Sequence, residues 1–211
     1  MNHSEKVTST EVPSASTIEP PMKPISCATL VGGGVKSLTR LRYMLTVEAN
    51  TQDAFGIWVT GLPASGKSTL TASLKEQLRA RGVDVAVLES DTLRKTFSPN
   101  PRYDEEERKT FYQQIADVGA LLIAQGVPVI FDATANRRAY RDRARKQITR
   151  FVEIYVDCPV PKHMAGRKTP ELQTDYEPPE TPDLVVTCEA ESPGAAAGRV
   201  VALLAEKGYI R

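Results

Sequence analysis

Gly61-Leu62-Pro63-Ala64-Ser65-Gly66-Lys67-Ser68 matches the pattern G-x-x-x-x-G-K-[ST] at every fixed position. A short apolar run rich in β-branched residues, residues 55–60, comes directly before it and is typical of a buried strand. After it, apolar residues recur at helical spacing over residues 68–81, and Gly82 ends that segment. In this setting backbone N–H groups and the positive end of a helix can hold a phosphate. The stretch therefore predicts a phosphate-binding loop in an α/β fold.

The residue types in this loop indicate how it would bind Mg-ATP. Lys67 is expected to reach the β- and γ-phosphates and to follow their charge during transfer, which makes it a catalytic residue. The Ser68 hydroxyl is expected to bind Mg²⁺. The predicted ATP-binding residues of this stretch are Gly61, Leu62, Pro63, Ala64, Ser65, Gly66, Lys67, Ser68 and Thr69. ATP and Mg²⁺ are accordingly the predicted cofactors.

Strand and helix patterns alternate along the rest of the chain. This alternation predicts an α/β fold of the P-loop NTPase type, a three-layer α/β/α sandwich with a five-stranded parallel sheet. Ligands of such folds lie at the carboxyl ends of the strands. The expected strands are residues 55–60, 83–88, 127–131, 151–156 and 184–187, and the expected helices are residues 68–81, 104–125, 138–150 and 195–207.

Composition limits the classes of partner. The chain has 27 Lys and Arg against 26 Asp and Glu, a net charge of +1, which gives no global reason to expect nucleic acid or an anionic membrane as a partner. No run of 18 apolar residues predicts a membrane span. The three cysteines, Cys27, Cys158 and Cys188, show no metal-binding spacing. We read them as thiols in a reducing compartment and expect a cytoplasmic protein.

The N-terminal part differs in composition from the remainder. Residues 1–25 contain seven Ser or Thr, four Pro and no aromatic residue, a composition that cannot form a core. We therefore predict that residues 1–53 are a disordered or poorly structured extension and that residues 54–211 form the P-loop kinase domain.

Two carboxylates follow predicted strands. Asp91 comes just after residues 83–88, where it can accept the proton of an acceptor hydroxyl or hold Mg²⁺ through water. Asp132 directly follows residues 127–131, as the metal-linked Asp of a Walker B strand does. The pattern leaves open which of the two is linked to the metal. Arg94, one helical turn after Asp91, is expected to face the same cleft.

An arginine-rich segment follows Asp132. Arg138, Arg141 and Arg145 are spaced to lie on one face of a helix. A solvated basic face is the ordinary explanation of such a run. Its position after a strand end suggests instead that Arg138 and Arg141 clamp an anionic acceptor or phosphate.

Together these motifs resemble the adenylylsulfate kinase family. The residues that carry the resemblance are 61–70, Asp91-x-x-Arg94, Glu107-Arg108, Asp132-Ala133-Thr134-Ala135-Asn136-Arg137-Arg138-x-x-Arg141, Val156-Asp157-Cys158-Pro159 and Tyr176-Glu177-Pro178-Pro179-Glu180. The resemblance implies transfer of the ATP γ-phosphate to the 3′-hydroxyl of adenosine 5′-phosphosulfate (APS), in sulfate assimilation. It also implies that Asp91 lies near metal and acceptor, and that Arg94, Arg108 and Arg138 hold the sulfated nucleotide.

The chain departs from the family pattern at two places. Phe111 stands where the family usually has an Asn on the long helix. The segment between Arg167 and Tyr176 is shorter than the family's lid by roughly a dozen residues, on the resemblance alone, and lids exclude water from the reaction. By resemblance Arg167 stacks on the ATP adenine, displaced by one position from the family's arginine.

Two other functions stay open at this point. The chain could phosphorylate another small anionic alcohol, since the arginine cluster suits an anion. It could also be a nucleotide-binding protein with a reduced lid and little transferase activity. Polynucleotide acceptors are disfavoured by the neutral chain, and a homodimer is the assembly that the resemblance suggests.

Overall fold

The computed structural model describes residues 54–158, 175–187 and 191–211. The predicted N-terminal extension, residues 1–53, lies outside the described residues. The elements follow one another as β1 (Gly56–Thr60), α2 (Lys67–Arg79), β2 (Ala86–Glu89), α3 (Ser90–Phe97), α4 (Glu105–Ala124), β3 (Val129–Asp132), α5 (Arg138–Gln147), β4 (Phe151–Val156), β5 (Leu184–Val186) and α6 (Pro193–Glu206).

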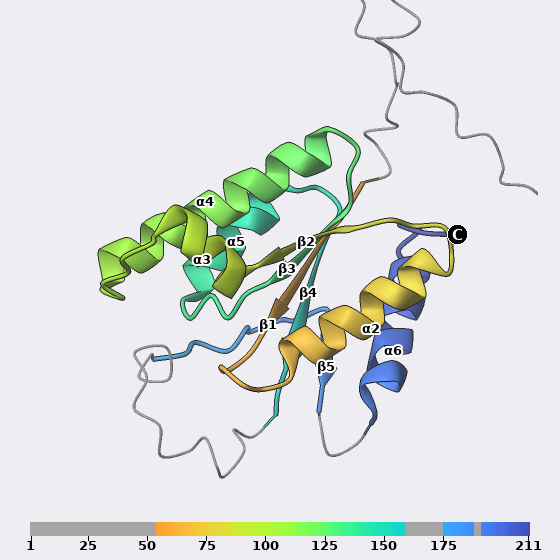
Figure 1. The fold of residues 1–211 in the computed structure, drawn as a ribbon. Helices are drawn as coiled ribbons and strands as arrows, with labels where there is room; N and C mark the ends of the chain where they lie inside the picture. The colour runs from red at the N-terminus through yellow and green to blue at the C-terminus, as the bar shows by residue number, and fades with distance from the viewer. Residues whose placement is uncertain (1–53, 159–174, 188–190) are drawn as a thin grey trace, which may run out of the picture. The chain divides into compact units, whose positions relative to one another are not determined.

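The strands form one parallel sheet. Its five strands run in the order β2-β3-β1-β4-β5, and every neighbouring pair is parallel. Helices α2 and α6 cover one face, and α3, α4 and α5 lie on the other (Figure 1). This architecture confirms the predicted three-layer sandwich with a five-stranded parallel sheet. Strand β1, which leads into the phosphate loop, is the central strand of the sheet. The loop therefore begins at the carboxyl end of the middle strand.

Alternation along β1 divides the core between the two faces. Ile57 and Val59 are fully buried in the cluster that contains α2 and α6, whereas Trp58 belongs to the cluster on the α4 side. Both faces of a parallel sheet are covered by helices, so its strands are apolar on both sides. On the α4 side the ring of Trp58 stacks on Phe131, with ring centroids 4.7 Å apart.

The close packing of α4 on the sheet depends on a glycine. A Cβ atom at Gly119 would lie 2.1 Å from the Phe131 ring, well inside contact distance. The N-terminus of α4 is capped by Asp104, whose carboxylate accepts a hydrogen bond of 2.9 Å from the Glu107 N–H. These two contacts fix the depth and the start of the helix that later supplies one wall of the pocket.

Several boundaries differ from the sequence-based expectation, among them the start of β3 at Val129 rather than residue 127 and the end of α5 at Gln147 rather than residue 150. Strand β2 begins at Ala86 rather than residue 83, because Val83 N–H still bonds to Leu78 O of α2, past Gly82 with φ +76°. Helix α3 was not among the expected helices. It has eight residues, and only Leu93 and Phe97 pack against the core, so its apolar pattern is too short to predict a helix.

The reading of the cysteines as thiols is wrong for Cys158. This residue, 4% exposed just after β4, is disulfide-bonded. Across residues 54–158, 175–187 and 191–211, we find no helix with the length and apolarity needed to cross a bilayer.

Candidate active site

The phosphate loop is built on backbone conformations that glycine favours. Gly61 has φ +150°, and a Cβ there would lie 2.5 Å from the Val156 carbonyl oxygen of the neighbouring strand β4. Gly66, with φ +95°, caps the start of α2, and Ala64 also has a positive φ of 63°. The sharp turns bring the backbone round in front of the N-terminus of α2, which is the anion-binding end of a helix.

Lys67 is folded back over the loop that it follows. Its Nζ donates to the carbonyl oxygens of Leu62 at 2.9 Å and Gly61 at 3.3 Å. Burial lowers the pKa of Lys67 to about 8, although the nearby carboxylates of Asp132 and Asp91 raise it. The ammonium therefore lies in a poorly solvated position where a phosphate would be a strong partner.

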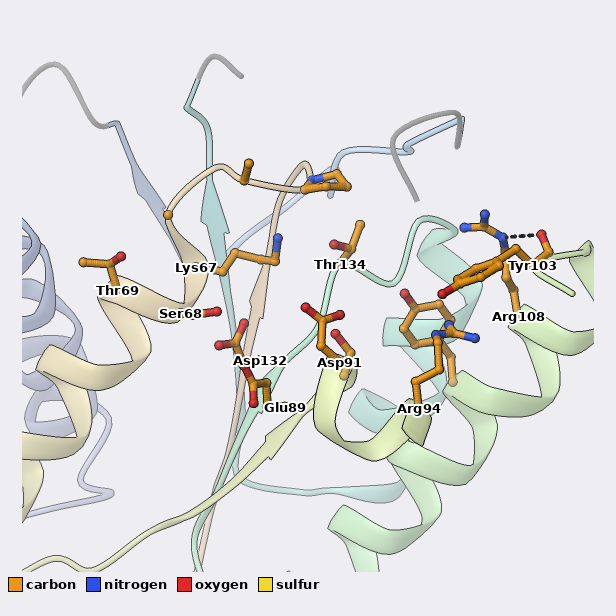
Figure 2. Close-up of a pocket in the computed structure, with 15 residues that line it drawn as sticks. Lys67, Ser68, Thr69, Glu89, Asp91, Arg94, Tyr103, Arg108, Asp132 and Thr134 are labelled. Atoms are coloured by element: carbon orange, nitrogen blue, oxygen red, sulfur yellow. Dashed lines mark hydrogen bonds between the residues drawn. The ribbon is translucent and has the colours of Figure 1, made fainter. Parts of the chain in front are cut away.

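One cavity joins this loop to the carboxyl ends of β2 and β3. It has a volume of about 390 Å³, and Figure 2 shows the residues around it. They are Pro63, Ala64, Gly66, Lys67, Ser68, Thr69, Glu89, Ser90, Asp91, Arg94, Tyr103, Arg108, Tyr112, Asp132 and Thr134. Most of the residues predicted from the sequence to bind ATP or the acceptor thus meet in one pocket.

The two rival carboxylates occupy different places in this pocket. Asp132 ends β3 and is 4% exposed, and Figure 2 shows the Ser68 oxygen turned toward it. Burial raises the pKa of Asp132, while the Ser68 hydroxyl and the Lys67 ammonium oppose that rise. Asp91, in the first turn of α3, is exposed and stands on the acceptor side, toward Arg94.

Oxygen donors at this position suit a hard cation. A serine hydroxyl beside a carboxylate is a donor set that Mg²⁺ accepts. In the part of the chain that the structure describes, no three His, Cys, Asp or Glu side chains cluster around a common point.

The wall opposite the phosphate loop is cationic and aromatic. Arg94 Nη1 donates to Glu107 Oε1 at 2.7 Å, and its guanidinium lies 3.9 Å from the centroid of the Phe111 ring. Arg108 Nε donates to the Tyr103 carbonyl at 2.9 Å, a contact drawn in Figure 2. Tyr103 has a positive φ of 58°, and its N–H donates to Glu107. The α4 start thus pins Tyr103 with its side chain on the pocket wall.

Arg138 and Arg141 do not line this pocket, contrary to the expectation of an anion clamp. Arg138 forms ion pairs with Glu180 and Glu177. Arg141 is 1% exposed, and its three guanidinium nitrogens donate to Glu153 and to the carbonyl oxygens of Ala135 and Glu177. A buried guanidinium whose three nitrogens each donate to a group inside the fold acts as a structural tie.

The third arginine of that helix face is also engaged inside the fold. Arg145 bonds to Glu153 and Asp183, so it too is part of an internal ion-pair network. Arg167 lies outside the described residues. Phe111 is fully buried beneath Arg94, where it supports that guanidinium from below.

Sequence reasoning missed several lining residues: Glu89, Ser90, Tyr103, Tyr112 and Thr134. Glu89 and Ser90 precede Asp91 at a strand end, so their position in sequence was a usable signal. Tyr112 follows Phe111 on α4 and lines the pocket, and burial raises the pKa of its hydroxyl. Thr134 likewise follows a strand end, two residues after Asp132, whereas nothing local in the sequence marks Tyr103 as part of the wall.

A second cavity adjoins the other side of the phosphate loop. It has a volume of about 220 Å³. Its lining is mostly apolar and consists of Ser65, Gly66, Thr69, Leu70, Val156, Val186, Glu191, Pro193 and Ala196. The fold brings these residues together from the loop, the ends of β4 and β5, and the start of α6.

Comparisons with known proteins agree on one family. The family model described as adenylylsulphate kinase matches residues 53–170. A probable adenylyl-sulfate kinase from Pyrococcus abyssi is 32% identical over 172 residues, which cover 75% of this chain and 99% of that relative. A probable bifunctional SAT/APS kinase 2 from Sorangium cellulosum is 34% identical over 170 residues, covering 74% of this chain but 29% of that relative.

A solved structure shares both the fold and part of the sequence. The Mycobacterium tuberculosis APS kinase CysC, in complex with AMPPNP and APS, matches with a TM-score of 0.65 and 28% identity. The match covers 72% of this chain and 98% of that chain.

Proposed function

Because this chain belongs to the adenylylsulphate kinase family, we propose that it transfers the γ-phosphate of ATP to the 3′-hydroxyl of APS. One observation carries the proposal. A single pocket joins Lys67 and Ser68 of the phosphate loop to Asp91 and to the arginines of the opposite wall. Such a pocket offers one end for ATP phosphates and another for an anionic alcohol.

The phosphate loop supplies the ATP end of this reaction. Lys67 would leave the loop carbonyls for the β- and γ-phosphates, where its charge follows the transferring group. Ser68 and Asp132 would hold Mg²⁺, which would supply positive charge to offset that of the phosphates. The apolar cavity beside Leu70 and Pro193 is where we place the adenine of ATP, since an aromatic base prefers such surroundings.

The acceptor end is formed by α3 and the start of α4. Asp91 would take the proton of the 3′-hydroxyl. The hydroxyl oxygen would then bond to the γ-phosphorus as the bond between that phosphorus and ADP breaks. Arg94 and Arg108 place positive charge beside the phosphosulfate. Tyr103 lines the same pocket, with its ring centroid 5.0 Å from the Arg94 guanidinium and 5.8 Å from that of Arg108, and it is the aromatic side chain that the acceptor base would contact.

The two carboxylates should separate in kinetics. We expect Asp91→Asn to lower kcat by about 10² or more, since it removes the base. Asp132→Asn should instead raise the Mg²⁺ concentration needed for half-maximal rate, because this carboxylate lies on the Ser68 side. Initial rates over a Mg²⁺ titration measure both. A small effect of Asp91→Asn with a large kcat loss in Asp132→Asn would exchange the two roles.

The direct test is acceptor-dependent ADP release. The full chain is supplied with Mg-ATP, with and without APS, and the product is identified by mass spectrometry. Release that requires APS and yields the 3′-phosphorylated nucleotide supports the proposal. ATP turnover or binding without APS dependence would overturn the acceptor and leave the ATP site standing. Self-association as a homodimer is a separate proposal, tested by light scattering during size-exclusion chromatography.

A further inference from the structure

The turn after β3 is held in place carbonyl by carbonyl. The four successive carbonyl oxygens of residues 133–136 each accept a hydrogen bond from another part of the fold. The donors, in order, are Trp58 Nε1 at 3.0 Å, Thr60 Oγ1 at 2.6 Å, Arg141 Nη1, and Glu177 N–H at 2.8 Å. A turn whose carbonyls are all engaged behind it has little freedom to change its direction.

The turn also has a strained backbone at Ala135, next to Thr134. Ala135 has a positive φ of 43°, which an alanine adopts only when its surroundings impose it. Thr134 immediately precedes it and lines the pocket. Figure 2 shows the Thr134 oxygen turned toward the space between Lys67 and Asp91. Within the described ranges of the chain, the one hydrogen bond between Thr134 and another side chain is the bond that its carbonyl oxygen accepts from Thr60. In that part of the chain the Thr134 hydroxyl therefore has no side-chain partner.

Sheet register places Thr134 next to the carboxylate that faces the acceptor. Strands β2 and β3 are parallel neighbours in which Glu89 pairs with Asp132. Asp91 and Thr134 each lie two residues beyond that pair, at the same edge of the sheet and in the same pocket. A carboxylate and a hydroxyl side by side are suited to two neighbouring hydroxyls of a substrate, because Thr can both donate and accept.

We propose that Thr134 is a specificity-determining residue whose hydroxyl binds the 2′-hydroxyl of the acceptor ribose while Asp91 faces the 3′-hydroxyl. The inference rests on the proposed function, since it assumes that a ribose is the acceptor. It adds that the enzyme recognises the vicinal diol and not the reacting hydroxyl alone. Trp58, Thr60 and Arg141 are then positioning residues, because they hold the turn that presents Thr134.

The experiment compares two acceptors on three proteins. APS and its 2′-deoxy analogue, which keeps the 3′-hydroxyl, are assayed with the wild type, Thr134→Val and Thr134→Ser. The wild type should prefer APS in kcat/KM by about tenfold, the worth of one hydrogen bond between neutral groups. Thr134→Val should lose about tenfold on APS and nothing on the analogue, so the preference disappears. Thr134→Ser keeps the hydroxyl and should keep the preference.

Other outcomes overturn the inference in distinguishable ways. Equal losses on both acceptors in Thr134→Val, or a raised KM for ATP alone, would assign Thr134 to the phosphates or to structure. A wild type that uses both acceptors equally would show that the 2′-hydroxyl is not recognised. A wild type that phosphorylates neither, while still binding ATP, would overturn the proposed function itself. Thermal unfolding of each variant, followed by circular dichroism, reports whether the fold is retained.

Discussion

Burial of the Lys67 ammonium in the phosphate loop lowers the stability of the folded protein when no ligand is bound. The side chain is 8% exposed, and its pKa is lowered to about 8. Its donors are occupied by loop carbonyls, which are weaker partners than phosphate oxygens. Exchanging the loop carbonyls for phosphate oxygens would therefore favour ATP binding. That gain arises at Lys67, whose charge has to follow the transferred phosphoryl group.

Replacing Lys67 by Met should abolish phosphate transfer and change how stability depends on pH. Below pH 8 the folded protein carries the buried charge, so the wild type bears a penalty that the variant lacks. Between pH 8 and 10.5 the unfolded chain binds more protons than the folded one, so the free energy of unfolding of the wild type rises. Relative to Lys67→Met, the total rise should be about 3 kcal/mol.

Denaturant unfolding at several pH values measures this difference. Lys75→Met, at an exposed position of the same helix, is the control for loss of a surface lysine. If the wild type and Lys67→Met differ by the same amount at pH 7 and pH 10.5, the ammonium is not buried as the structure has it.

At the scale of elements, one buried ion pair ties α5 to the sheet. Arg141 Nε donates to Glu153 Oε1 at 2.6 Å, and the two side chains are 1% and 7% exposed. The other Glu153 oxygen accepts from Arg145 at 3.2 Å. These bonds connect the helix after the Thr134 turn to the centre of β4. Helix α5 therefore sets the pocket wall without contributing a side chain to it.

We expect Glu153→Gln to reduce the free energy of unfolding by about 3 kcal/mol or more, because it leaves the Arg141 charge buried without a counter-charge. Asp117→Asn is the matched control. It removes the carboxylate facing Arg143 on the same helix, in a pair whose side chains are 46% and 42% exposed. That change should cost about 1 kcal/mol or less. Comparable losses in the two variants would mean that the Arg141 pair is solvated.

At the scale of the whole molecule, every site residue that the structure places lies within residues 54–158, 175–187 and 191–211. The described residues alone supply two core clusters and the linings of the two cavities. We predict that removal of residues 1–50 leaves the unfolding midpoint and kcat/KM for both substrates unchanged. Thermal unfolding and steady-state rates of the full and shortened chains test this. A clear loss of either would show that the extension contributes to the domain.

The fold and the ATP side of the site were largely predictable, while the acceptor side was not. The Gly61–Ser68 motif and the alternating periodicity predicted the parallel sheet, every helix of the described residues except α3, and the place of Lys67. Helix periodicity correctly put Arg138 and Arg141 on one face of α5. It does not say what that face packs against, and the partners Glu153 and Glu177 come from distant segments.

By itself the sequence determined the local features of this protein. They are the phosphate loop, the alternation of strands and helices along the chain, and the family. These follow from contiguous motifs and from burial periodicity, which each segment carries independently of the others. Only the tertiary structure decided which arginines reach the pocket and which residues, Tyr103 and Thr134 among them, form its wall. The reason is physical: those roles depend on ion pairs and hydrogen bonds between residues far apart in the chain, which form only when the sheet is assembled.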